Sequence, residues 1–334
     1  ISYMLDRLMR KFGLSGKAVV PMMSGFACAI PAIMATRNIK SWKERLITIM
    51  VTPLMSCSAR LPVYILLIGM LVPAKKIMGV FNLQGLTMTA FYYVGLVVAL
   101  IIAGILSYFL KVEEQTPFIL EMPRYRVPQW RNVVITMYKK AKVFAVEAGK
   151  VILVISIILW LLQSYGPKAK MAAIEDKYEQ LANGEAIEGA LLKNYEQERL
   201  NASYAGHIGQ FIEPVIKPLG YDWKIGISLI TSFAAREVFV GTMATLYSVD
   251  VDEENPKNLQ ERLLAEKDPE TGRQVYSFAT VFSLLLFYAF AMQCMATLAV
   301  VYRETKSWKW PIIQLIYLTT LAYGLSFIAY QILK

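Results

Sequence analysis

Charged residues, histidine and cysteine are scarce in this sequence. Only 18% of the 334 residues are charged while 56% are hydrophobic, whereas a soluble domain carries about a quarter charged residues. Apolar side chains therefore exceed what one soluble core can bury, which argues against a soluble enzyme, a disordered chain or a nucleic-acid-binding domain. The single histidine, His207, argues against a polyhistidine metal site, and three cysteines, an odd number, argue against a closed set of disulfides.

Motifs for nucleotide binding and hydrolysis are also missing. The chain has no GxxxxGKS/T phosphate loop, no GxGxxG after a strand, no HExxH and no GxSxG. A membrane-embedded hydrolase lacks any readable nucleophile–base pair here. We therefore expect that this chain is not an enzyme.

Long stretches with little or no charge are what the sequence does contain. A bilayer crossing takes about 20 apolar residues, and in lipid an open chain must be helical to satisfy its backbone. We predict an all-α, polytopic helical bundle whose first two segments are broken or re-entrant. The expected membrane-embedded segments are residues 18–36, 46–74, 77–110, 151–167, 225–249, 274–302 and 310–333.

Composition also divides the chain into four parts. Residues 1–110 are expected to hold about three membrane segments. Residues 111–150 read as a cytoplasmic amphipathic connector, and residues 151–224 as a membrane helix followed by an extramembrane helical insert. Residues 225–334 hold a second charged membrane segment and the C-terminal membrane helices.

The net charge of +10 is concentrated in short loops, and cytoplasmic loops carry an excess of Lys and Arg. Loops 37–45 and 111–142 are therefore predicted inside. Alternation then places residues 168–222 outside, 250–273 inside and 303–309 outside.

The first candidate site is SGFACAIPAIMATR, where Cys28 and Pro31 are three residues apart. Pro31 lacks an N–H and clashes with the carbonyl of Ala27, four residues earlier. Broken backbone at membrane depth is tolerated only where protein buries it or it lines a cavity, and transporters place ion sites at such breaks. The alternative is a proline kink beside an inert, buried cysteine.

The second candidate is TPLMSCSARLPVY, in which Pro53 and Pro62 bracket Cys57 and Arg60. An intramembrane arginine costs about 3 kcal/mol or more. Arg60 is therefore expected to face a cavity, pair with an acid or bind carbonyls freed by the prolines. The alternative is an arginine that snorkels to an interface.

The third candidate is TSFAAREVFVGTMATLY, with Arg236 and Glu237 adjacent in an apolar segment. Neighbours on a helix do not face each other, so these two need not pair. Glu237 offers oxygen ligands to a divalent cation. A structural ion pair, for example between Glu237 and Arg60, is the alternative.

Two weaker signals accompany these sites. MSCSARLPVY and TSFAAREVFV share a Ser and an Ala-Arg pair at matching offsets, a faint sign of the internal repeats found in transporters. Cys294 lies between Met292 and Met295, and all three cysteines fall in expected membrane segments. Thiolate, thioether and carboxylate suit soft-to-borderline metals such as ferrous iron, with simple packing as the alternative.

Several stretches resemble one known family. GLSGKAVVPMMSGFACAIPAIMATR and ERLITIMVTPLMSCSARLPVY resemble the first Gate region of the FeoB ferrous iron transporters. TPFILEMPRYRVP and FAVEAGKVILVISIILW resemble the segments between the Gates, and IGISLITSFAAREVFVGTMATLY resembles the second Gate. The resemblance covers nearly the whole chain in the same order.

This resemblance implies the membrane-spanning part of a GTP-regulated Fe²⁺ importer in the bacterial inner membrane. Fe²⁺ is then the transported substrate, and GTP with Mg²⁺ would bind only an upstream G domain. We expect the chain, which begins at Ile1, to be a fragment without that domain and without the first membrane helices. Implied partners are membrane lipid, FeoA- and FeoC-type cytosolic proteins and further copies of the protein, but no nucleic acid.

The resemblance also implies roles for single residues. The implied metal path is Cys28, Pro31, Cys57, Glu237 and Cys294, and the implied gating or helix-orienting residues are Arg60, Arg236, Pro53 and Gly25. Two positions depart from the family's pattern: Ala29 stands where Asn is frequent, and Ser58 where Gly is common.

The expected mechanism is an iron path between the two Gate regions. Fe²⁺ would shed water at Cys28 and at carbonyls freed by Pro31, with Cys57 and Glu237 as the next ligands. Since Fe²⁺ lies low in the divalent affinity order, geometry and availability must help to select it. The rivals are a Gate-type carrier of nucleosides or other solutes, and a membrane scaffold whose buried charges are structural.

Overall fold

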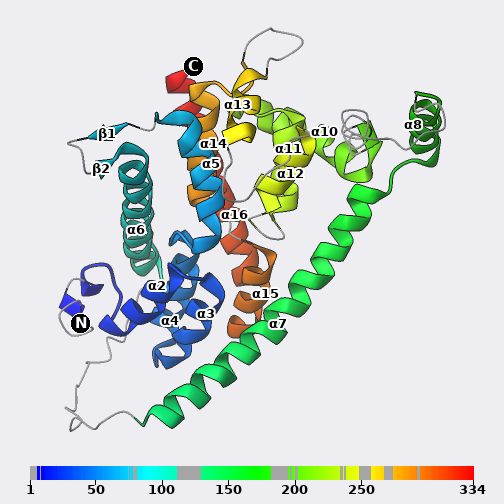
Figure 1. The fold of residues 1–334 in the computed structure, drawn as a ribbon. Coiled ribbons are helices and arrows are strands. Elements are labelled where there is room, and N and C mark those ends of the chain that lie inside the picture. The colour runs from blue at the N-terminus through cyan, green and yellow to red at the C-terminus, as the bar shows by residue number, and fades with distance from the viewer. Residues whose placement is uncertain are drawn as a thin grey trace. The chain divides into compact units, whose positions relative to one another are not determined.

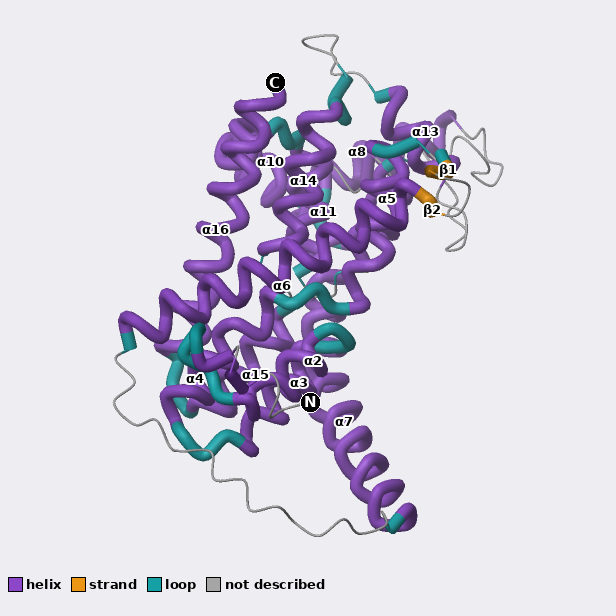
Figure 2. The backbone as a smooth tube through the Cα atoms, turned by 90° about the vertical axis from the view of Figure 1, so that its left-hand side faces the viewer, coloured by secondary structure: helices purple, strands orange, loops and turns teal. Residues whose placement is uncertain are grey.

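The fold is known from a computed structural model, which describes residues 6–7, 9–73, 75–77, 81–110, 129–181, 195, 198–199, 202–233, 236, 238–247, 257–266, 274–291 and 294–334. Nearly all of these residues are helical (Figures 1 and 2), apart from one antiparallel pair of two-residue strands, β1 (Lys76–Ile77) and β2 (Phe81–Asn82). The chain forms two compact units. Unit 1 comprises Ile1–Ser58, Tyr92–Leu153 and Met295–Ile316, and unit 2 comprises Ala59–Phe91, Val154–Cys294 and Tyr317–Lys334.

Four helical stretches in the described residues are long and apolar enough to cross a membrane: Trp42–Leu71, Leu83–Phe109, Phe278–Thr305 and Lys309–Leu333. They coincide with four of the expected segments, so the prediction of an all-α membrane protein is confirmed. The expected segments 18–36 and 225–249 instead form pairs of short helices, and 151–167 belongs mostly to the long helix α7 (Trp130–Ser164).

Unit 1 is organised around a helical hairpin. Helices α2 (Val19–Gly25) and α3 (Ala29–Ala35) pack against each other. Both outer ends of this hairpin, η1 (Gly16–Ala18) and η2 (Thr36–Asn38), contact α4 (Trp42–Val51), and its helices reach η3 (Thr52–Leu54), directly after α4. The hairpin therefore runs alongside α4 and turns back where α4 ends.

The core of unit 1 joins this hairpin to α15 (Met295–Thr305). Ile33 of α3, Ile49 of α4 and Val301 of α15 are fully buried together. Gln314, in α16 (Lys309–Leu333), is also buried, and its Nε2 donates to the carbonyls of Ile49 and Met50 at 3.1 and 3.3 Å.

Unit 2 contains a second helical hairpin, α11 (Trp223–Ser232) and α12 (Val238–Leu246). Helix α10 (Tyr204–Ile216), followed by η5 (Lys217–Leu219), packs on α11. Helix α5 (Leu61–Leu71) packs against α12, α13 (Lys257–Ala265) and α14 (Phe278–Phe290). Helix α8 (Lys168–Leu181) follows α7, and α6 (Leu83–Phe109) contributes its first residues to this unit and the rest to unit 1.

Two of the predicted loop orientations are wrong. Arg37 and Arg45 both form ion pairs with Glu304, so loops 37–45 and 303–309, predicted on opposite sides, lie at the same end of unit 1. In unit 2, Gln260 of α13 donates to the carbonyl of Leu66 at 3.2 Å. Helix α13, predicted inside, thus lies beside α5. Helix α5 leads to the loop near Lys75 and Lys76, which lies between the two loops predicted inside and is therefore expected outside by the same alternation. The predicted alternation fails after this point because α11 and α12 form a hairpin, whereas the prediction assumed one crossing helix.

Candidate functional site

Cys28 lies in the turn of the first hairpin. Helix α2 ends at Gly25, and Cys28 has extended backbone (φ −158°, ψ 136°) at the N-cap of α3. Its side chain is partly exposed. Pro31 falls in the first turn of α3, where its missing N–H is not needed by the helix. The predicted break is present, and it separates two helices rather than kinking one.

The carbonyl of Ala27, which we expected Pro31 to free, is bound by Ser58. Ser58 donates to it twice, from its backbone N at 3.4 Å and from Oγ at 2.9 Å. A carbonyl has two lone pairs, so these two bonds fill its capacity. The proline does release the carbonyl from helical bonding, and Ser58 binds the carbonyl in place of a helical N–H.

Cys57 lies in a second break, between η3 and η4 (Ser58–Arg60), and is buried. Pro53 is at the start of η3. The two breaks meet closely because residue 25 is glycine: a Cβ there would lie 3.3 Å from Cβ of Met55. Together with the Ser58–Ala27 bonds, this contact places Cys28 and Cys57 on neighbouring segments of unit 1.

Arg60 directly precedes α5, in unit 2, and its side chain is 0% exposed. A side chain enclosed in this way is not snorkelling, so that alternative for Arg60 is wrong. Its predicted acidic partner, Glu237, lies outside the described residues. The structure therefore tests neither the ion pair of Glu237 with Arg60 nor the binding of a cation by Glu237.

Arg236 lies at the turn of the second hairpin and is 3% exposed. Its two terminal nitrogens donate to the carbonyls of Tyr288 and Ala291 at 2.7 and 2.6 Å. These carbonyls end α14, where they have no helical partner, and the helix dipole favours a cation there. Arg236 thus binds the freed carbonyls of a neighbouring helix, the behaviour that the sequence suggested for Arg60.

Cys294 is in the segment that α14 leads into, just before α15, and is partly exposed. Arg236 therefore ties the turn of the second hairpin to the break that carries Cys294. All three cysteines are thiols and each lies between helices. Within the described residues, no three His, Cys, Asp or Glu side chains gather as a metal site.

The outer end of the second hairpin carries charge. Asp222 caps α11 by accepting the N–H of Ile225 at 2.8 Å, and burial raises the pKa of this carboxyl to about 6. Lys224 binds Glu266 at 2.8 Å and lies 4.3 Å from the ring centre of Tyr247, just after α12. These contacts hold the two outer ends of the hairpin together.

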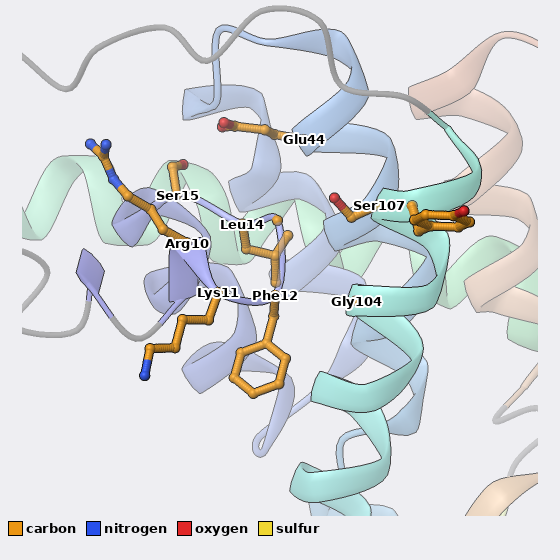
Figure 3. Close-up of a pocket in the computed structure, with 10 residues that line it drawn as sticks. Arg10, Lys11, Phe12, Leu14, Ser15, Glu44, Gly104 and Ser107 are labelled. Atoms are coloured by element: carbon orange, nitrogen blue, oxygen red, sulfur yellow. The ribbon is translucent and has the colours of Figure 1, made fainter.

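Sequence reasoning missed two features of unit 1. One is the pairing of Glu304, 3% exposed, with Arg37 and Arg45; their separation of more than 250 residues left no local signal. The other is a pocket of about 350 Å³ beside the outer end of the first hairpin, between the loop of residues 10–15 and α6 (Figure 3). Its walls include Arg10, Lys11, Ser15, Glu44, Gly104 and Ser107.

These features define a multi-pass helical membrane protein with two helical hairpins, each turning at a helix break. The family model described as "Gate: Nucleoside recognition" matches residues 1–71 and 145–308, and that described as "Ferrous iron transport protein B C terminus" matches residues 88–140. The first covers more than half of the chain, so the chain belongs to the Gate family. Neither model is a GTPase domain.

The chain is similar to known proteins over nearly its whole length. It is 45% identical to the Fe(2+) transporter FeoB of Leptospira interrogans over 99% of this chain and 45% of that protein. It is 34% identical to the Fe(2+) transporter FeoB of Helicobacter pylori over 99% of this chain and 50% of that protein. It is 36% identical to a fusion of Fe(2+) transport protein A with FeoB in Porphyromonas gingivalis, over 99% of this chain and 39% of the fusion. The chain thus spans half or less of these relatives, and no solved structure matches it.

Proposed function

We propose that this chain is the membrane-spanning part of a GTP-regulated ferrous iron importer and forms the ion path across the bacterial inner membrane. Its FeoB relatives are named as Fe(2+) transporters and are similar over nearly all of its length. Regulation by GTP would come from a G domain in the complete protein.

The observation that carries the proposal is the contact between the first two breaks. Because Ser58 binds the carbonyl of Ala27, the thiols of Cys28 and Cys57 lie on adjoining segments at the turn of the first hairpin. Cysteine binds Fe²⁺ as a thiolate, so each thiol must lose its proton when the metal binds. Since the Ala27 carbonyl is occupied, the two thiols and not this carbonyl are the first ligands. Cys294 and Glu237 would follow.

We further propose that both hairpins are re-entrant and form a pseudo-repeat. In each half, the hairpin turn meets a break in the next long helix, through Ser58 in one half and Arg236 in the other. Each hairpin turn thus lies beside a helix break, as in the repeats of transporters.

The family description "Nucleoside recognition" supports a second candidate, a carrier of nucleosides or other solutes. Such a site needs amide groups that face the ligand. Gln314 instead binds main-chain carbonyls of Ile49 and Met50, and Gln84 binds that of Val72. The Nε2 donors of these amides are used within the protein, which favours the iron path.

FeoA-type proteins are proposed as partners because the Porphyromonas gingivalis relative is a fusion with Fe(2+) transport protein A. FeoC-type proteins, membrane lipid and further copies of the protein remain expectations from the family resemblance.

Anaerobic Fe²⁺ uptake into proteoliposomes, driven by the full-length protein that contains this chain, tests the proposal. We expect Cys28→Ser and Cys57→Ser each to lower uptake at least tenfold. Ser24→Ala is the matched control, because Ser24 lies in the same hairpin and its hydroxyl donates to the carbonyl of Val20 in its own helix. Excess nucleoside should not compete. Nucleoside competition, or full uptake by both cysteine variants, would overturn the proposal.

A further inference from the structure

Helix α10 has three different faces. At about 100° per residue, its side chains fall into three groups centred about 120° apart. Ala205, Gly209 and Ile216 are buried on the first face. The second face is polar and consists of His207, Gln210 and Glu213. The third face is an exposed apolar stripe that consists of Tyr204, Ile208, Phe211 and Val215.

The buried face packs closely on α11 of the second hairpin, beside which α10 lies in Figure 1. A Cβ on Gly209 would lie 2.5 Å from Cγ1 of Ile227, and a Cβ on Gly226 would lie 3.0 Å from Cδ1 of Ile216. Glycines on both helices therefore permit this contact, and α10 and α11 interlock.

The polar face points toward the hydrophilic insert. Nε2 of His207 lies 3.3 Å from Nζ of Lys170 in α8. His207 and Gln210 line a pocket of about 250 Å³ together with Lys170 and Glu198. This side of α10 belongs with the water-facing part of unit 2.

The third face is apolar, yet no described residues cover it. Its four side chains are between 37% and 83% exposed, and Phe211 is the most exposed of them. The helix has 13 residues, or about 20 Å of length, which is too short for a hydrocarbon core of about 30 Å. It is therefore not a span.

Contacts with two other helices, α7 and α16, set the position of α10. The N–H of Tyr204 donates to the carbonyl of Tyr165, just past the end of α7, at 3.0 Å. Oη of Tyr323 donates to the carbonyl of Val215 at 2.9 Å. Tyr323 lies within the span Lys309–Leu333, about 15 Å from its C-terminal end. The apolar stripe thus runs from the end of α7 to the interior of the span Lys309–Leu333.

We propose that α10 is a lipid-facing helix whose stripe of Tyr204, Ile208, Phe211 and Val215 inserts among the acyl chains of one leaflet, reaches inward to the depth of Tyr323, and anchors the second hairpin there. An amphipathic helix that is too short to span can bury its apolar face among acyl chains while its polar face stays with water and protein. The leaflet is the one on the side of α8, which contacts the polar face of α10 through Lys170. The close contact between Gly209 and Ile227 connects this anchor to α11. The turn of the hairpin is held separately, by the bonds of Arg236 to the carbonyls at the end of α14.

Photocrosslinking of the full-length protein in nanodiscs of phosphatidylethanolamine and phosphatidylglycerol tests the anchor. The probe p-benzoylphenylalanine is placed at position 211 or, as the matched control, at the adjacent polar-face position 210. We expect position 211 to gain the mass of one phospholipid at least tenfold more often than position 210. Equal lipid labelling at both positions, or a cross-link from 211 to a second copy of the chain, would overturn the proposal.

Hydrogen exchange of α11 in the same nanodiscs tests the coupling to the hairpin. A charge in the stripe, Phe211→Asp, should speed exchange of the α11 amides at least tenfold, whereas Gln210→Asp should not. If the α11 amides exchange at the same rate in both variants, α10 does not anchor the hairpin.

Discussion

Replacing Arg236 should destabilise the second hairpin in proportion to the hydrogen bonds that are lost. The guanidinium makes two charge-assisted bonds, at 2.7 and 2.6 Å, to the carbonyls that end α14. Each is worth about 1.5–3 kcal/mol, and because Arg236 is 3% exposed, water does not replace them. Arg236→Ala should therefore lower the free energy of unfolding by about 3–6 kcal/mol. Arg236→Lys keeps the charge but cannot serve both carbonyls with one fork, so it should lose about half of this.

Reversible unfolding in mixed detergent micelles measures these differences. Arg10→Lys is the control, because Arg10 is half exposed and pairs with Asp6 one helical turn away; such a pair is worth about 0–1 kcal/mol. Fe²⁺ uptake by Arg236→Lys should fall as well, since the break that carries Cys294 loses its support. Stability of Arg236→Lys within about 0.5 kcal/mol of the unmodified protein would refute the reasoning.

Three further substitutions probe other contacts. Ser58→Ala removes the Oγ bond to Ala27 but keeps the backbone bond, so thermal unfolding should show a loss of about 1 kcal/mol and Fe²⁺ affinity should drop. Glu304→Gln leaves Arg45 without its buried counter-charge and should cost about 3–5 kcal/mol, which Arg45→Gln in the same protein should partly restore. Asp222 has a pKa raised from 3.8 to about 6; the native state then holds more protons than the unfolded state in this window, so stability falls as pH rises through it. Asp222→Asn should abolish that fall in melting curves from pH 4 to 7 and be more stable above pH 6.

The sequence predicts the helix breaks well because their causes are local. Pro31 and Pro53 lie where new helical turns begin, and both neighbouring cysteines lie in the breaks. The four candidate spans likewise follow from uncharged stretches of sufficient length. These features depend on backbone chemistry and composition, which a single sequence contains in full.

Orientation could not be predicted in the same way. Residues 225–249 have the composition of one span, yet they fold as α11 and α12, side by side. Nothing local distinguishes a hairpin from a crossing helix when both are buried in apolar surroundings. The difference depends on contacts such as that of Thr231 with Thr242, whose hydroxyl oxygens are 3.0 Å apart.

The partners of the site residues were also beyond local reasoning. The sequence indicated that Pro31 frees a carbonyl, but not that Ser58, 31 residues after Ala27, would bind it. It indicated that an intramembrane arginine needs oxygen partners, but not that Arg236 finds them 52 and 55 residues away. Such pairs are set by tertiary packing.

Anaerobic Fe²⁺ titration of the purified protein, with proton release followed in the same experiment, tests the central claim most directly. The comparison uses Cys28→Ser, Cys57→Ser and Glu237→Gln beside the unmodified protein. Thiolate ligation predicts that the unmodified protein binds Fe²⁺ and releases protons, and that either cysteine variant loses both. Equal binding by all four proteins would contradict the account, because Cys28 and Cys57 would then only pack the two breaks.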